Sequence, residues 1–146
     1  MEARCGCGAL TVRVPGRASM VVACHCTECQ RRTGSPFGVG AFYRWGDVEI
    51  TGAATEFARD GAAGGKVRTS FCPTCGSAVY WRADRAPGLV AIAVGCFNDP
   101  AHPEPNRSIW ERSGLPWATV IADQHLPGGS RRSDPVTASP LPRRPG

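Results

Sequence analysis

Short runs of apolar, β-branched and aromatic residues recur between residues 10 and 94, and glycine or proline separates most of them. In residues 10–14, apolar and polar positions alternate with the period of two that is typical of a half-buried strand. Short strands at this spacing predict a mainly β fold, a small antiparallel domain rather than an α/β one. Six further runs have the composition of strands, namely residues 21–23, 39–43, 48–51, 67–71, 78–81 and 89–94.

One stretch has the character of a helix. Residues 27–33 lie between Cys26 and Gly34 and are long enough for one or two turns. Gly34 is the residue type that most readily adopts the left-handed conformation that ends a helix. We therefore expect Thr27–Thr33 to be helical and the domain to contain little other helix.

The composition is that of one globular domain followed by a tail. The chain has 146 residues, of which 42% are hydrophobic and 20% are charged, enough for one domain with a core. Residues 127–146 contain five Pro, three Gly, three Ser and four Arg. Such a segment cannot bury enough apolar surface to offset the entropy lost on ordering. We expect residues 1–126 to form the domain and residues 127–146 to be a disordered Pro/Gly/Arg-rich tail.

The net charge of +5 at pH 7 comes largely from this tail. Residues 127–146 hold four Arg and one Asp, so residues 1–126 carry 13 basic and 11 acidic residues, a charge of +2. A domain this close to neutrality lacks the basic patch of a nucleic-acid binder. No apolar run approaches the roughly 18 residues that a membrane-spanning helix needs, and the first residues do not resemble a secretory signal. We expect a cytoplasmic protein with no nucleic-acid or membrane partner.

Eight cysteines need an explanation in a reducing compartment. Disulfides are rare in the cytosol, where closely spaced cysteines more often bind a metal. Their spacing therefore predicts zinc sites. Seven of the eight fall into tight groups and Cys96 stands alone; the groups are Cys5 and Cys7, then Cys24, Cys26 and Cys29, then Cys72 and Cys75.

Two of the groups complement each other. Cys72-Pro-Thr-Cys75-Gly places two sulfurs on one side of a tight loop, because the glycine lets backbone N–H groups point at sulfur. Tetrahedral zinc takes four ligands, and Cys5-Gly6-Cys7 supplies the other two if the chain bends at Gly6. We expect Cys5, Cys7, Cys72 and Cys75 to form a closed structural zinc site. The alternative, a redox dithiol at Cys72 and Cys75, lacks a surrounding βαβ pattern.

The third group has three sulfurs within six residues, from Cys24 through Cys26 to Cys29. This triad can hold one zinc ion and leave the fourth position open, which is the mark of a catalytic site. The alternative is that Cys96 or a histidine closes the site. His25 lies between two of the cysteines and is expected to point away from the metal that they share.

Several segments resemble one family, in the same order along the chain. Residues 3–9 read ARCGCGA and are similar to its opening G-S-C-x-C-G-A. Residues 24–37 resemble its central C-H-C-x-x-C-R-R-x-x-G-x-P-F, and residues 71–77 its F-C-x-x-C-G-S. Pro116-Trp117 and the residues up to 127 are similar to its closing stretch. The family is the glutathione-dependent formaldehyde-activating enzymes, which are related to centromere protein V.

The resemblance implies a β-tent domain with two zinc ions. The four-cysteine group would hold the structural ion, and Cys24, Cys26 and Cys29 would be the active-site triad. The implied activity joins formaldehyde to glutathione to give S-hydroxymethylglutathione, a carbon–sulfur lyase reaction when written in reverse. The sequence departs from the family at Gln30, where Arg is usual, and at Cys96, where a small or hydroxylated residue is usual.

The chemistry of the triad agrees with that activity. A zinc ion held by three thiolates favours a soft fourth ligand, and coordination lowers the pKa of a substrate thiol, which can then attack a small carbonyl. Arg31 and Arg32 follow closely on the triad and are candidates to bind carboxylates of a peptide thiol such as glutathione. The alternative is that both are solvated at the end of the helix. Phe37 and Trp117 are expected in the core rather than in the wall of a pocket.

The leading hypothesis is therefore a zinc-dependent enzyme of the carbon–sulfur lyase type that acts on an adduct of a small thiol and a small aldehyde. The alternative is a non-catalytic, zinc-stabilised interaction module like the family's centromeric relative. The occupancy of the fourth position at the triad distinguishes these hypotheses. The oligomeric state stays open, and a homo-oligomer is compatible with the sequence.

Overall fold

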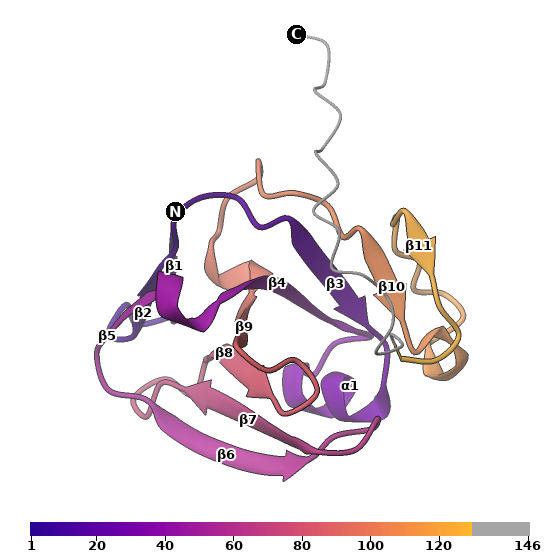
Figure 1. Cartoon of the computed structure of the whole chain (residues 1–146), viewed down its shortest axis with the longest axis horizontal. Helices are drawn as coiled ribbons and strands as arrows, with labels where there is room; N and C mark the ends of the chain where they lie inside the picture. Colours follow the sequence, from indigo (N-terminus) through magenta and orange to yellow (C-terminus); the bar gives the residue numbers. More distant parts are fainter. Residues whose placement is uncertain (130–146) are drawn as a thin grey trace, which may run out of the picture.

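A computed structural model of the chain describes residues 1–129, which form two β-sheets and one α-helix (Figure 1). The smaller sheet is antiparallel and has the strand order β1-β2-β5. Its strands are β1 (Glu2–Arg4), β2 (Thr11–Arg13) and β5 (Glu49–Thr51).

The larger sheet has eight strands in the order β11-β10-β3-β4-β9-β8-β7-β6. The mainly β prediction is confirmed, and the strands from β3 to β6 in this order pair antiparallel. Strand β10 pairs parallel with both β3 and β11, so the sheet is mixed rather than wholly antiparallel. The strands are β3 (Met20–Cys24), β4 (Gly38–Arg44), β6 (Thr55–Asp60), β7 (Lys66–Phe71), β8 (Ala78–Ala83), β9 (Leu89–Ala93), β10 (Arg107–Ile109) and β11 (Gln124–His125).

Helix α1 (Thr27–Thr33) has the limits that the sequence predicted. The Cys26 sulfur caps its first turn by accepting a hydrogen bond from the Cys29 N–H. Gly34 ends the helix in the left-handed conformation, with φ of 63°, which a residue with a side chain adopts only under strain. Three short 3-10 helices complete the secondary structure of residues 1–129: η1 (Trp45–Asp47), η2 (Val94–Cys96) and η3 (Glu111–Ser113).

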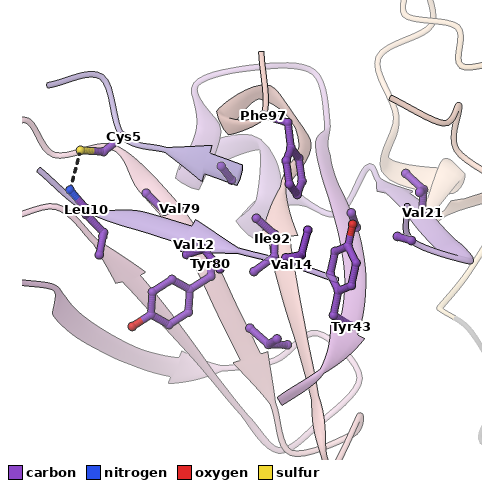
Figure 2. Close-up of a cluster of buried hydrophobic side chains, with 14 of the residues drawn as sticks. Cys5, Leu10, Val12, Val14, Val21, Tyr43, Val79, Tyr80, Ile92 and Phe97 are labelled. Carbon is purple, nitrogen blue, oxygen red and sulfur yellow. Dashed lines mark hydrogen bonds between the residues drawn. The ribbon is translucent and has the colours of Figure 1, made fainter. Parts of the chain in front are cut away.

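The core lies between the two sheets, as Figure 2 shows for its larger side chains. Burying an aliphatic side chain of this kind contributes about 1.5–3 kcal/mol. The core therefore holds the small sheet against the large one. Fully buried aliphatic members are Leu10, Val12, Val21, Val79, Val90 and Ile92.

Helix α1 covers the other face of the large sheet. Side chains alternate between the two faces along a strand, and Ala41 on β4 and Ile92 on β9 belong to the core. Their neighbours Gly40 and Ala91 therefore face away from it, toward the side chain of Trp81 on β8. The helix contacts β4 on that side, inside the curve that the sheet makes in Figure 1. The end of β3 at Cys24 lies beside it.

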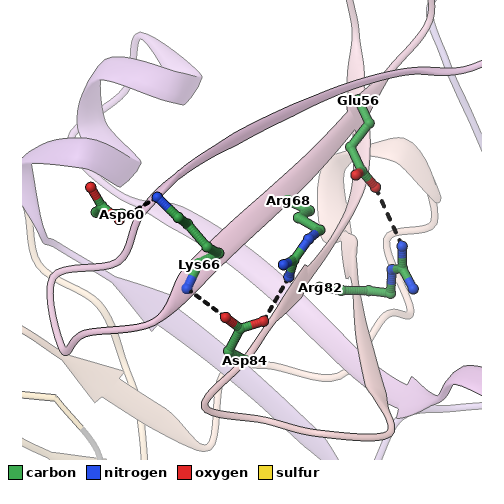
Figure 3. Close-up of polar contacts among 6 residues, drawn as sticks. All are labelled: Glu56, Asp60, Lys66, Arg68, Arg82 and Asp84. Atoms are coloured by element: carbon green, nitrogen blue, oxygen red, sulfur yellow. Dashed lines mark hydrogen bonds and ion pairs between the residues drawn. The ribbon is translucent and has the colours of Figure 1, made fainter.

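Ion pairs cross the outer strands β6, β7 and β8 (Figure 3). Arg68 and Arg82 stand directly opposite each other on β7 and β8, and each pairs with a carboxylate, Asp84 at 2.6 Å and Glu56 at 3.3 Å. Exposed pairs of this kind add little stability singly. Their effect is to prevent the repulsion between like charges that two opposed arginines would otherwise cause.

The described chain ends against the segment that contains η3. The Trp110 N–H donates to the Gly128 carbonyl at 2.9 Å, and the Arg112 N–H donates to the Pro127 carbonyl at 3.2 Å. Residues 127–129 are thus seen in contact with the domain, whereas the rest of the predicted tail, residues 130–146, lies outside the described residues. Across residues 1–129, no helix combines the length and apolar character that crossing a bilayer requires.

Candidate functional site

The structure gathers the first and third cysteine groups into one cluster. The sulfurs of Cys5, Cys7, Cys72 and Cys75 all lie within 4.8 Å of one another. The separation is 3.6 Å between the sulfurs of Cys5 and Cys7, and 3.7 Å between those of Cys7 and Cys72. Four sulfurs bound at about 2.3 Å to one tetrahedral zinc lie about 3.8 Å apart. The donor set and its dimensions therefore fit one zinc ion.

Two loops bring these sulfurs together. The loop after β1 carries the first pair and the loop between β7 and β8 carries the second, and the Gly6 N–H joins them by donating to Ser77 Oγ at 3.1 Å. Gly76, with φ of 75°, donates its N–H to the Cys72 carbonyl at 2.8 Å, which closes the second loop. The positive φ of the first loop lies at Gly8 (78°) rather than at Gly6, where the sequence suggested a bend.

Hydrogen bonds to sulfur favour the thiolate form of Cys5 and Cys75, whereas the neighbouring sulfurs of Cys5 and Cys75 raise the pKa of Cys7 to about 11. The Leu10 N–H donates to the Cys5 sulfur at 3.2 Å (Figure 2), and this bond is the main cause that lowers the pKa of Cys5. The hydroxyl and N–H of Ser77 lower the pKa of Cys75 to about 5. Thiolate is the form that binds a metal, so the surroundings of the cluster suit it to a cation.

The middle group forms a second, smaller cluster. The sulfurs of Cys24, Cys26 and Cys29 all lie within 4.8 Å of one another. Cys24 ends β3, Cys26 caps α1 and Cys29 lies in its first turn, so a strand end and a helix start supply the three sulfurs. Within residues 1–129, no fourth Cys, His, Asp or Glu side chain joins this cluster. The triad thus resembles a metal site with three protein ligands and room for one more.

The His25 side chain faces away from the triad. It is buried, and its Nε2 forms a hydrogen bond of 3.0 Å with Ser108 Oγ on β10. Burial lowers the pKa of His25, which favours the neutral ring. This placement agrees with the expectation from sequence.

Two polar side chains fix the peptide between Cys24 and Cys26. The side-chain amide of Gln30 donates to the His25 carbonyl at 2.7 Å and to the Ser113 carbonyl at 2.8 Å. The Ser113 hydroxyl donates to the same His25 carbonyl at 3.1 Å. The triad is therefore anchored to η3, more than 80 residues further along the chain. Sequence reasoning noticed Gln30 only as a departure from the family pattern, and nothing local marked Ser113.

The two candidate arginines have different surroundings. The Arg31 guanidinium pairs with Glu28 at 2.8 Å on the outside of the helix, and its side chain is 74% exposed. The Arg32 guanidinium lies 4.2 Å from the centre of the Trp81 ring, between α1 and the sheet. Of the two, only Arg32 thus lies on the sheet side of the helix.

Cys96 belongs to neither cysteine cluster and lies nearer to the four-sulfur cluster than to the triad. Its thiol points at the Ala78 carbonyl, 3.7 Å away, and burial and the nearby charges of Cys5 and Cys75 raise its pKa. It lines a cavity of about 640 Å³ together with Cys5 and Ser77. In this arrangement it does not close the triad.

Of the two aromatic candidates, Phe37 packs against a buried ring and Trp117 is exposed to solvent. The Phe37 ring packs against the His25 ring, with centroids 5.3 Å apart. Trp117 is 73% exposed, so the expectation that it lies in the core is wrong. It stands in the long irregular segment between η3 and β11, where no strand or helix turns it inward.

Comparisons with known proteins agree with the pattern of cysteines. The family described as "Glutathione-dependent formaldehyde-activating enzyme" matches residues 1–113. A crystal structure of a Rhodobacter sphaeroides protein superposes with a TM-score of 0.53 and 23% sequence identity, covering 66% of this chain and 86% of that one. At this identity the likeness shows the fold alone. A search of curated proteins found no match.

Proposed function

Because the chain belongs to the glutathione-dependent formaldehyde-activating enzyme family, we propose that it joins a small thiol to a small aldehyde at the Cys24–Cys26–Cys29 cluster. A sulfur–carbon bond forms, the carbonyl becomes a hydroxyl, and the thiol proton ends on that oxygen. With glutathione and formaldehyde the product is S-hydroxymethylglutathione. The reverse reaction breaks a carbon–sulfur bond, as in a lyase.

We also propose that the protein acts in the cytoplasm. Its eight cysteines are all unpaired in the described structure, and they would stay reduced there.

One observation carries this proposal, namely the difference between the two cysteine clusters. The first has four sulfurs, which fill the tetrahedral shell of zinc, and the second has three with no further protein ligand in residues 1–129. We infer two zinc ions per chain, a structural one in the first cluster and one in the second. When bound at the triad, zinc would supply a Lewis-acidic position that accepts a thiolate.

The contribution of the chain is to hold the three sulfurs in place. Cys26 Sγ accepts the Cys29 N–H at 3.4 Å, which orients that sulfur toward the start of α1. The Gln30 amide and the Ser113 hydroxyl hold the carbonyl between the first two cysteines. Outer hydrogen bonds of this kind fix the direction of metal ligands and tune their affinity.

Titration of the full chain with glutathione tests the proposal. The protein is loaded with zinc, its metal content is measured, and calorimetry is performed in buffers of different ionisation enthalpy. We expect two metal ions per chain and a proton released on binding, since the thiol ionises as it binds. In cobalt-loaded protein the visible spectrum should change on addition of thiol. If millimolar glutathione gave neither signal in fully loaded protein, the enzyme hypothesis would be abandoned.

One observation favours the alternative, a non-catalytic interaction module. Leu115, Trp117 and Ile121 are exposed on the segment after η3, at 37%, 73% and 77%. If their side chains form one contiguous apolar patch, that patch would be typical of a protein-binding surface. The same titration separates the hypotheses, because a module without an open metal position would bind no thiol.

A further inference from the structure

Arg32 is held against the aromatic ring of Trp81. The guanidinium carbon lies 4.2 Å from the ring centre, the geometry of a cation–π contact. The guanidinium also passes close to β4, where Nη2 lies 2.6 Å from the position that a Cβ at Gly38 would occupy. A larger residue than glycine there would push Arg32 aside.

Gly40 makes the matching space for Trp81. A Cβ at this position would lie 2.6 and 2.8 Å from two carbons of the indole ring, far inside van der Waals contact. The two glycines of β4 therefore act together. The absence of a side chain at Gly40 leaves room for the Trp81 indole, and its absence at Gly38 leaves room for the Arg32 guanidinium that packs on the indole. In the β3–β4 register Gly38 stands opposite Cys24, so this arrangement borders the triad.

The Arg32 guanidinium has no carboxylate partner within residues 1–129, although it is half-buried. Arg31, one residue earlier, is paired with Glu28 and exposed. A half-buried cation without a counter-charge is costly, and an anionic ligand would remove that cost. The side chain is thus ordered by an aromatic ring yet keeps its hydrogen-bond donors for another group.

Arg32 lies beside the triad. It follows Cys29 by three residues in α1, and the Arg32 Nη2 and the Cys29 Cβ approach the same point on β4, at 2.6 and 3.6 Å from the position of a Cβ at Gly38. A thiol whose sulfur lies at the triad would carry its other groups past this cation.

We propose that Arg32 binds a carboxylate of the thiol substrate and that Trp81 is the positioning residue that holds it there. The inference rests on the proposed function and adds to it the residue that distinguishes thiols with a carboxylate from neutral thiols. Arginine forms strong, charge-assisted hydrogen bonds with carboxylates, so such thiols would be preferred over neutral ones. Arg31 would take no part.

Two thiols and two arginine variants test this in full-length, zinc-loaded protein. Glutathione carries carboxylates and 2-mercaptoethanol carries none, and the dissociation constant of each is measured by calorimetry. We expect Arg32→Gln to weaken glutathione binding about tenfold, the loss of one charge-assisted bond, and to leave 2-mercaptoethanol unchanged. Arg31→Gln removes the same charge one residue away and should alter neither constant.

Two substitutions at Trp81 test the positioning role. Trp81→Leu removes the aromatic face and should weaken glutathione binding about threefold, the value of an exposed cation–π contact. Trp81→Phe keeps an aromatic face and should restore most of the loss. A merely structural role of Trp81 would instead lower the affinity for both thiols together.

The outcomes separate this inference from the proposed function. If the wild-type protein binds neither thiol, both are overturned. If it binds both thiols and Arg32→Gln weakens them equally, Arg32 only balances the charge of the thiolates, and this inference alone is overturned. An equal effect of Arg31→Gln on glutathione would also overturn it.

Discussion

The side-chain nitrogen of Gln30 lies 2.7 Å from the carbonyl oxygen of His25, the residue between two cysteines of the triad. The same nitrogen lies 2.8 Å from the Ser113 carbonyl, so one amide group ties helix α1 both to the triad and to η3. A cysteine cluster made of a strand end and a helix start has little rigidity of its own. Here a distant segment supplies it.

Replacing Gln30 by Ala should therefore loosen the triad without unfolding the domain. Loss of an outer hydrogen bond of this kind lowers metal affinity about 10–100-fold. Competition with a chromophoric chelator would show one weakened site of two. Gln124→Ala, on an exposed strand, is the matched control and should leave both sites unchanged; a similar loss in the control would contradict the role given to Gln30.

The two clusters should respond differently to loss of a sulfur. Cys72→Ser breaks the four-sulfur cluster, which joins the N-terminal loop to β7, and should cost several kcal/mol of the free energy of unfolding. Cys26→Ser should leave the domain folded but lose one metal ion. Circular dichroism melts and metal analysis check this prediction. If both variants melted alike, the division into a structural and an open site would be wrong.

Cys96→Ala should change neither the metal content nor the affinity for thiols. Its sulfur belongs to neither cluster and lines a cavity that the smaller side chain merely enlarges. The cost in stability should be below about 1 kcal/mol, as for most changes outside a tightly packed core. A clear rise in glutathione affinity would show instead that this thiol occupies the fourth position at the triad.

Gly40→Ala should destabilise the protein by about 1–3 kcal/mol, the usual cost of an added methyl group in a packed site. The new Cβ would collide with the Trp81 ring at 2.6 Å. Gly46→Ala is the control, because no atom lies within 4 Å of the added carbon. Chemical denaturation of both variants measures the difference. Equal stabilities would show that the ring moves aside without cost.

The Asp84 carboxylate makes part of the stability depend on pH. The Arg68 guanidinium and the Lys66 N–H hold its pKa below the ordinary value. A carboxyl group with a depressed folded-state pKa stabilises the fold above its unfolded pKa of about 3.9. That contribution is lost as the pH falls through the folded-state pKa. Asp84→Asn should thus be less stable than wild type at pH 7, and the difference should shrink between pH 4 and pH 2 in urea denaturation; a constant difference would contradict it.

Local signals in the sequence predicted the parts of the site that are local. The limits of α1 followed from Cys26 and Gly34, and the second cysteine cluster followed from three cysteines within six residues. The joining of Cys5 and Cys7 to Cys72 and Cys75 followed from the number of ligands that zinc requires. These inferences needed no knowledge of how the strands pair.

Features that depend on pairing between distant segments could not be predicted. Strand β6 has a polar, exposed sequence because it is an edge strand, so no apolar pattern marks it. Strand β10 has only three residues and is defined by its parallel partner β3. The contact of Arg32 with Trp81 joins residues far apart in the chain. The feature of the sequence that relates to it is the pair of glycines in β4, which leave space for the two side chains.

The two cysteine clusters also differ in how far along the chain their members are spread. The triad is complete within residues 24–29, so a growing chain holds all three of its sulfurs before most of the sheet has been made. The four-sulfur cluster has only Cys5 and Cys7 until Cys72 and then Cys75 emerge from the ribosome. During synthesis the thiols of Cys5 and Cys7 therefore lack the other two cysteines of their cluster, while the triad already has all the sulfurs with which it could bind a metal ion.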